Sequence, residues 1–207
     1  MSKRSILLSM AVAGLALSTS LLLAQDAKFE AFDGESERGS TSIAYFSQPS
    51  EDEFNAEGGF VITYGRPEWK AEYDAQFDEL TKGKRWRFGN NSWTTLDTNI
   101  PLKIAGAKVG PGYYYLVLER GQGDDWSLVI LDPKPLQKKK MAASGAEETS
   151  GGINAPLKAS MTAEPATRLT VNLTKNESDL TKASLDIQWG KRKLSAPIDV
   201  GVEVPSS

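Results

Sequence analysis

The stretch GYYYLVLERGQGDDWSLVIL, residues 112–131, decides the fold class of this chain. It contains two runs, 113–118 and 126–131, that are apolar at nearly every position. Strands that are covered on both faces have this composition. The runs are joined by residues 120–125, which are polar or charged and include two glycines, as expected of a hairpin loop. The sequence therefore predicts a β-hairpin whose two faces are both buried.

Four further segments alternate between apolar and polar residues, which places one face of a strand on a core and the other in water. They are residues 60–64, 169–173, 183–189 and 198–204. Together with the hairpin they predict an all-β fold, a single antiparallel β-sandwich or flattened barrel of about nine or ten strands. The expected core includes Val117, Trp126, Leu169, Val171, Leu185, Ile187 and Trp189.

One segment has the period of a helix instead. Tyr73, Phe77 and Leu80 fall at positions i, i+4 and i+7 within residues 71–82, and Gly83 follows as a stop signal. We therefore expect one short helix over an end of the sheet.

The N-terminus has the pattern of a secretory signal peptide. Lys3 and Arg4 precede an apolar run from Ile6 to Ala24. We predict a signal peptide at 1–24, with cleavage before Gln25 and a periplasmic or secreted bacterial location; the alternative is an uncleaved membrane anchor, since the run is long enough to approach a bilayer span. No other segment is comparably apolar, so no membrane span is expected after signal removal.

The remaining chain divides by composition. Residues 25–42 are polar and predict a flexible lead-in, and residues 43–204 predict the β domain. Residues 133–156 interrupt the β pattern with two prolines, a lysine triplet and a glycine-rich end, and predict a disordered loop.

Composition excludes several kinds of chemistry. The chain has no cysteine and no histidine, which excludes Ser-His-Asp and Cys-His catalysis, histidine-ligated zinc and lipid attachment through cysteine. Removing Lys3 and Arg4 with the first 24 residues takes the formal net charge from −3 to −5, which argues against nucleic acid as a partner. No catalytic motif, metal-ligand spacing or cofactor fingerprint is present, so we expect no metal and no cofactor.

Five short motifs occur in order along the β region. They are VITYGRP (61–67), WRFGNN (86–91), IAGAKVGPGYYYL (104–116), DWSLVI (125–130) and LDIQWG (185–190). In this order they resemble the DUF2911 family of bacterial exported proteins, over roughly residues 58–200. The resemblance implies export, but the family carries no assigned activity.

Four residues within these motifs form the candidate ligand-binding set: Arg66, Trp86, Arg87 and Asn91. Arginine and asparagine beside tryptophan suit a carboxylate, a phosphate or a sugar. The competing interpretation is structural, since arginine stacked on tryptophan also closes the end of a β-sandwich, and Asn90 and Asn91 suit turn positions.

Three functions are compatible with this sequence. The leading hypothesis is a non-enzymatic envelope domain that binds a ligand or a protein partner at one end of the sandwich. The second is a hydrolase that acts on envelope polymers with carboxylates alone. The third is a purely structural envelope component.

Overall fold

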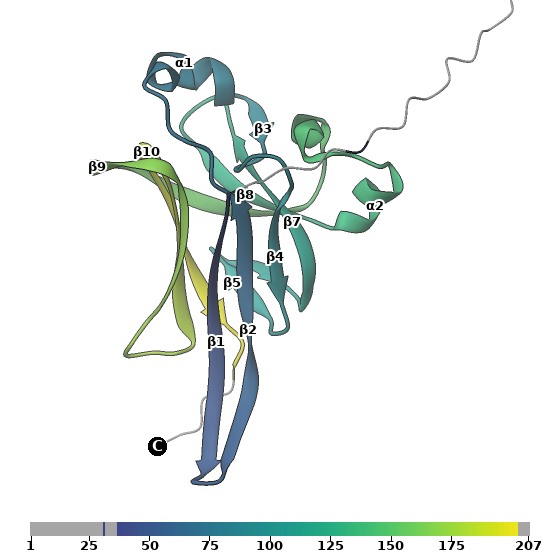
Figure 1. Ribbon diagram of the computed structural model, residues 1–207, viewed down its shortest axis with the longest axis vertical. Helices are drawn as coiled ribbons and strands as arrows, with labels where there is room; N and C mark the ends of the chain where they lie inside the picture. Colours follow the sequence, from purple (N-terminus) through teal and green to yellow (C-terminus); the bar gives the residue numbers. More distant parts are fainter. Residues whose placement is uncertain (1–30, 32–36, 203–207) are drawn as a thin grey trace, which may run out of the picture. The chain divides into compact units, whose positions relative to one another are not determined.

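Residues 31 and 37–202 are described in the computed structural model, and they form ten strands, two α-helices and one 3-10 helix (Figure 1). In chain order the elements are β1 (Arg38–Ser50), β2 (Glu53–Gly65), α1 (Glu72–Thr81), β3 (Lys84–Trp86), β4 (Thr94–Thr98), β5 (Leu102–Ile104), β6 (Ala107–Val109), β7 (Gly112–Arg120), β8 (Trp126–Leu131), α2 (Pro133–Lys138), η1 (Ala143–Glu148), β9 (Ile153–Lys175) and β10 (Lys182–Val200). The all-β prediction and the expected number of strands are confirmed.

The strands form one antiparallel sheet in the order β1-β2-β4-β7-β8-β9-β10-β5-β6, with β3 beside β7. The sheet is open, because β1 and β6 lie at its two ends. Strand β9 connects the two halves of the sheet. Its first part, Ile153–Leu157, pairs with β8, whereas residues 158–175 pair with β10 through two register shifts. The two halves of the sheet therefore face each other, as β9 and β10 show where they curve away from β1 and β2 (Figure 1).

The main core fills the space between these halves. It combines Leu116 and Leu118 of β7 with Leu169 of β9 and Leu185 of β10, each no more than 1% exposed. At the β1–β2 side, the Tyr64 hydroxyl donates a 3.3 Å hydrogen bond to the carbonyl of Val171 on β9. The apolar sides of both halves are thus buried against each other, as a sandwich requires.

A second apolar cluster covers the outer face of the predicted hairpin. Val117 and Val129 are completely buried there, together with Trp93, Leu131, Leu136, Ala143 and Ala146. The last three come from α2 and η1, and α2 lies beside β7 in Figure 1. The prediction that both faces of β7 and β8 are buried is confirmed, and α2 and η1 supply the outer cover.

The prediction of a disordered loop at 133–156 is wrong, because this segment contains α2, η1 and the start of β9. The Asp132 side chain accepts a 2.9 Å hydrogen bond from the backbone N–H of Lys134, and Pro133 occupies the first turn of α2. Leu136 then turns inward while the lysines stay exposed. Strand β9 already begins at Ile153. Short helices of this kind need few apolar residues, so their composition resembles that of a loop.

Other expectations are confirmed in part. The helix forms as α1, with Lys82 as its C-cap and Gly83 next at φ +70°, but Leu80 is 44% exposed. All the expected core residues are buried except Trp189, which is half-buried. Residues 183–189 and 198–200 belong to one long strand, β10, rather than to two.

The N-terminal boundaries also differ. Strand β1 begins at Arg38, so the last residues of the lead-in predicted at 25–42 belong to the sheet. The signal peptide predicted at 1–24 and most of that lead-in lie outside the described residues. Residues 37–202 lie within one compact unit. Within this range, no helix is long and apolar enough to cross a membrane.

Candidate functional site

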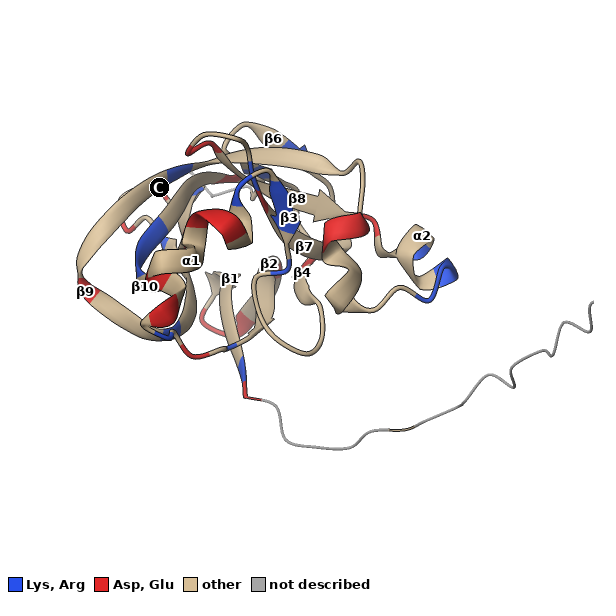
Figure 2. Cartoon of the chain, turned by 90° about the horizontal axis from the view of Figure 1, so that it is seen from above, with Lys and Arg blue, Asp and Glu red and all other residues tan. Residues whose placement is uncertain are grey.

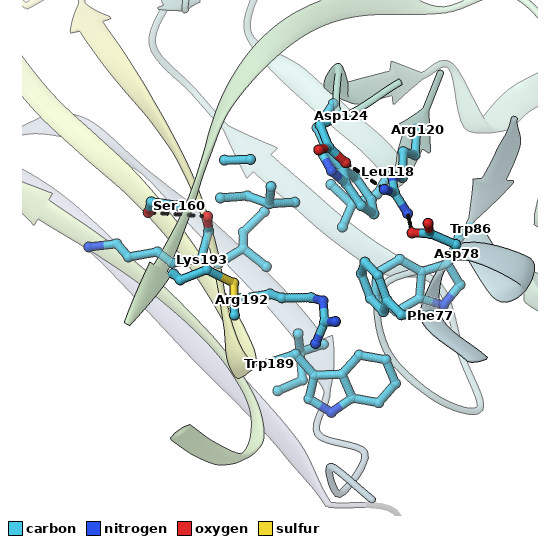
Figure 3. Close-up of a pocket in the computed structure, with 16 residues that line it drawn as sticks. Phe77, Asp78, Trp86, Leu118, Arg120, Asp124, Ser160, Trp189, Arg192 and Lys193 are labelled. Atoms are coloured by element: carbon cyan, nitrogen blue, oxygen red, sulfur yellow. Dashed lines mark hydrogen bonds and ion pairs between the residues drawn. The ribbon is translucent and has the colours of Figure 1, made fainter. Parts of the chain in front are cut away.

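A cavity among the described residues lies beside helix α1, between the two halves of the sheet (Figure 3). Its volume is about 540 Å³, within the range of small-molecule sites. Side chains from α1, β3, β7, β8, β9, β10 and the loop between β7 and β8 contribute to it: Phe77, Asp78, Trp86, Leu118, Arg120, Asp124, Trp126, Ala159, Ser160, Met161, Leu169, Ile187, Trp189, Arg192, Lys193 and Leu194. We call this cavity the aromatic pocket.

Two stacked tryptophans form one wall of the aromatic pocket. Trp86 and Trp189 stack with ring centroids 5.3 Å apart and ring planes 19° apart. Pairing of Trp86 with Leu118 places β3 beside β7, whereas Trp189 comes from β10 in the other half of the sheet. Both rings are half-buried. A ring face that is half in contact with protein and half open suits stacking on a flat ligand.

The orientation of Trp189 is fixed from behind. Its Nε1–H donates a 3.2 Å hydrogen bond to the carbonyl of Pro67. The rings of Trp69 and Tyr73 pack against it, with centroids 5.0 Å and 5.3 Å away. Gly190 has φ +61°, and a Cβ atom there would lie 2.6 Å from the Trp69 ring. A glycine is therefore needed beside the tryptophan pair, for the backbone conformation and for the close approach of Trp69.

Arg120 closes the pocket on the α1 side. Its Nη1 donates to the carboxylate of Asp78 (2.7 Å) and to the Thr81 hydroxyl (3.0 Å), and its Nη2 donates to Asp124 (2.5 Å). The guanidinium also lies over the rings of Phe77 and Trp126, at 5.4 Å and 5.5 Å from their centroids. Arg120 is 5% exposed, so its charge is buried but paired.

These contacts change the protonation equilibria of Arg120 and Asp78. Burial lowers the pKa of Arg120, but the hydrogen bonds and charges of Asp78 and Asp124 outweigh it, so the pKa is raised above its ordinary value. The hydrogen bond from Arg120, helped by its charge, lowers the pKa of Asp78 below the usual range. Both groups are therefore ionised at neutral pH.

Arg192 is the second cation of the aromatic pocket. Its guanidinium carbon lies 3.9 Å from the centroid of the Phe77 ring and 5.4 Å from that of Trp69. Its Nη1 donates a 2.7 Å hydrogen bond to Asp74 on α1. The acidic residues of α1 and the basic residues of β10 are neighbours in Figure 2. Helix α1 is thus held over the pocket by two arginine–aspartate contacts, one on each side of Phe77.

Only one of the four predicted site residues, Trp86, lines the aromatic pocket. Arg66 donates from Nη1 to the Glu37 carboxylate (2.8 Å) and from its backbone N–H to the Glu37 carbonyl (3.2 Å). Arg87 donates from Nη1 to the Asn91 carbonyl (3.3 Å). Asn91 has φ +59°, the left-handed turn conformation that the sequence suggested. Among the described residues, Arg66, Arg87 and Asn91 therefore make contacts that stabilise the local backbone conformation.

A close backbone contact explains the glycines around these residues. A Cβ atom at Gly65 would lie 2.5 Å from the carbonyl oxygen of Asn90, and one at Gly89 would lie 3.3 Å from the backbone nitrogen of Gly65. The motifs around Arg66 and Arg87 thus meet at a backbone junction that has no room for side chains.

Sequence reasoning did not identify Arg120, Arg192 or Phe77 as site residues. Arg120 begins the predicted hairpin loop and Phe77 lies on the predicted helix face, so neither position indicates a binding role by sequence alone. Within residues 37–202, no group of three or more acidic side chains has an arrangement that would hold a metal ion.

Comparison with known proteins places the chain in a family. A profile of DUF2911, described as a protein of unknown function, matches residues 49–198, which include every residue that lines the aromatic pocket. The chain belongs to the DUF2911 family. No curated protein and no solved structure matches it. The aromatic pocket thus lies wholly within the DUF2911 region of the chain.

Proposed function

We propose that this DUF2911 protein is an exported, non-enzymatic domain of the bacterial cell envelope that binds a small ligand in the aromatic pocket. The observation that carries the proposal is the stacked pair Trp86–Trp189, half-buried at the edge of a cavity of about 540 Å³. Apolar and aromatic walls with a few convergent polar groups are typical of small-molecule sites.

The carboxylates of the pocket support binding more than hydrolysis. A carboxylate-dependent hydrolase needs one carboxylic acid that is protonated and one carboxylate that is ionised. Asp78 and Asp124 both accept hydrogen bonds from Arg120, so the guanidinium occupies the position between them. The lowered pKa of Asp78 further disfavours a role as general acid.

A purely structural role is disfavoured because an unfilled pocket lowers the stability of the fold. Filling a cavity with apolar side chains stabilises a core, and empty apolar space lowers stability. Here the half-exposed tryptophans and the buried charge of Arg120 surround open volume instead. Such an arrangement is expected where binding, rather than maximal stability, is selected.

Ligand binding is tested with a pair of tryptophan substitutions on β9. Ala159 is exposed, lines the pocket, and lies in register with Leu194. Ala159→Trp should fill the pocket without disturbing the core. Ala163→Trp is the matched control, since Ala163 is exposed on the same strand but does not line the pocket.

The experiment is a thermal-shift screen of organic anions, amphiphiles and glycans against residues 25–207. Ligand at 100 times its dissociation constant should add about 2.7 kcal/mol of stability. Ala159→Trp should abolish that shift and Ala163→Trp should retain it. If no compound stabilises the protein, or if both variants respond alike, the proposed function is wrong.

Export is tested separately. Mass spectrometry of the protein from its native envelope should find a chain that begins near Gln25. An intact Met1 terminus in the inner membrane would instead support the anchor alternative.

A further inference from the structure

We propose that the ligand of the aromatic pocket is an amphiphile with an apolar body and one anionic head group, a carboxylate or a phosphate, which binds Arg192. This inference rests on the proposed function, because it names the class of ligand for the same pocket. Three properties of the lining support it: an aliphatic floor, polar groups that are mostly paired, and a partly exposed arginine, Arg192, with donors to spare.

The floor of the pocket is aliphatic. Leu118, Leu169 and Ile187 line it from three different strands, and each is at most 3% exposed. Leu194 and Met161 also line the pocket and add to its apolar surface. Each methylene of a ligand that is buried against such a surface contributes about a fourfold gain in affinity. The floor therefore favours an acyl chain or another apolar body.

The polar groups around this floor are mostly occupied. Three N–H donors of Arg120 bind Asp78, Thr81 and Asp124, while its Nε is buried without a hydrogen-bond partner among the described residues. The Lys193 ammonium lies 3.2 Å from the Asp186 carboxylate, and its side chain points away from the pocket (Figure 3). The Ser160 hydroxyl donates to the Lys193 carbonyl. A glycan, whose many hydroxyls each need a partner, would leave several of them unpaired here.

Within residues 37–202, Arg192 makes fewer polar contacts than Arg120 and is more exposed. One ion pair, Nη1 to Asp74, is present among the described residues, and a guanidinium carries five N–H donors. Its side chain is 26% exposed, compared with 6% for Arg120. The Arg192 guanidinium carbon lies over the Phe77 ring, 3.9 Å from its centroid. A guanidinium that remains partly exposed can bind a carboxylate or a phosphate through two parallel N–H donors.

Asp74 competes with the ligand for this arginine. Its side chain is 61% exposed on α1, so an ion pair there is weak and can be exchanged for water at little cost. An anionic head group that displaces the Asp74 carboxylate would form an ion pair with Arg192, and the Asp74 carboxylate would become solvated. Removing the charge of Asp74 should therefore strengthen binding of an anion and leave binding of an uncharged ligand unaffected.

The test uses residues 25–207 and monomeric probes below their micelle concentrations. Titration calorimetry compares dodecanoate, monododecyl phosphate, dodecanol and cellobiose, with octanoate and decanoate as shorter chains. Dodecanoate or dodecyl phosphate should bind more tightly than dodecanol, and affinity should rise about fourfold per methylene until the pocket is filled. The comparison of the two anions identifies the preferred head group.

Three variants locate the head group. Arg192→Gln should weaken dodecanoate about tenfold, the value of a hydrogen-bonded charge, and leave dodecanol unchanged. Asp74→Asn should tighten dodecanoate severalfold without affecting dodecanol. Arg87→Gln is the control, since Arg87 does not line the pocket, and should change neither.

The outcomes separate this inference from the proposed function. The proposal of an anionic head group is wrong if dodecanoate and dodecanol bind equally well. It is also wrong if neither Arg192→Gln nor Asp74→Asn changes the affinity for dodecanoate. Binding of cellobiose alone, still blocked by Ala159→Trp, overturns the amphiphile and leaves the proposed function intact. If Ala159→Trp blocks no probe at all, the proposed function itself fails. Because Asp74 is exposed, Asp74→Asn remains informative even if Arg192→Gln unfolds the domain.

Discussion

The guanidinium of Arg120 donates a 2.7 Å hydrogen bond to the carboxylate of Asp78, and this contact ties the end of strand β7 to helix α1. The two partners differ in environment, because Arg120 is 5% exposed whereas the Asp78 side chain is 70% exposed. Losing one partner therefore has different consequences from losing the other. A buried cation without a counter-ion is costly, whereas an exposed carboxylate that loses its partner is simply solvated.

Arg120→Met should change the free energy of unfolding by less than about 1.5 kcal/mol, because an apolar side chain of similar length replaces the buried charge. The double substitution Asp78→Ala with Asp124→Ala should be more destabilising, since it leaves the guanidinium buried without a carboxylate. Urea unfolding followed by far-UV circular dichroism measures both. The opposite order would mean that the ion pairs, not the burial of Arg120, determine stability at this site.

Stability should also fall in acid. Asp78 has a pKa below the ordinary 3.8 because of its hydrogen bond to Arg120, and Asp199 has one because of its hydrogen bond to Lys182. A lowered folded-state pKa contributes stability above the ordinary pKa, and that stability is lost as the pH falls through the lowered value. The free energy of unfolding should stay level from pH 7 to about 5 and decrease below about pH 4.

Asp78→Asn tests the origin of this decrease. The amide cannot be protonated in this range, so the variant should be less stable than wild type at pH 7 and should lose less stability on acidification. Urea unfolding at intervals between pH 2 and 7 gives both values. Parallel curves for the two proteins would show that Asp78 contributes nothing to the acid response.

The outer apolar cluster gives the third prediction. Leu136 on α2 is 9% exposed and packs in the cluster that covers Val117 and Val129. Leu136→Ala should therefore cost about 2–3 kcal/mol, at the lower end of the range for buried leucines. Leu180→Ala, at a 39% exposed position in the turn before β10, should stay within about 0.5 kcal/mol of wild type.

Limited proteolysis provides an independent readout of the same cluster. Residues 133–148 should resist cleavage in wild type and become sensitive in Leu136→Ala, because α2 and η1 depend on that contact. Rapid cleavage of wild type between 133 and 148 would restore the interpretation of this segment as a disordered loop.

Residues 133–148 also show which parts of the fold can be predicted from the sequence. The double-sided apolar runs 113–118 and 126–131 predicted that both faces of β7 and β8 are covered, and they are. The cover was not recognised, because α2 and η1 contribute only Leu136, Ala143 and Ala146 to it. In a strand, alternating residues indicate the buried face at every second position along its length. A six-residue helix has only one or two buried side chains, too few for a recognisable period.

The site was less predictable than the fold for a related reason. Trp86 was identified within its motif, but its neighbour Trp189 lies in another strand, and only the turn of the sheet at β9 brings them together. The contacts of Arg120 and Arg192 with α1 likewise depend on where the helix sits. The one local signal was the position of Arg120 at the end of an apolar strand, where a charge is expected to be paired.

The last prediction concerns Gly190, whose backbone lies in the left-handed region at φ +61° and whose missing side chain leaves room for Trp69. Gly190→Ala imposes two costs: the strained backbone, about 1–2 kcal/mol, and displacement of the Trp69 ring, which adds about 1–3 kcal/mol. Gly106→Ala separates them, because Gly106 has φ +89° with no atom within 4 Å of the added Cβ. It should show the backbone cost alone. Since Trp69 packs against Trp189, Gly190→Ala should also shift the tryptophan emission spectrum and weaken ligand binding, whereas Gly106→Ala should do neither. Equal unfolding free energies and equal spectra for the two variants would show that Trp69 does not support the tryptophan pair.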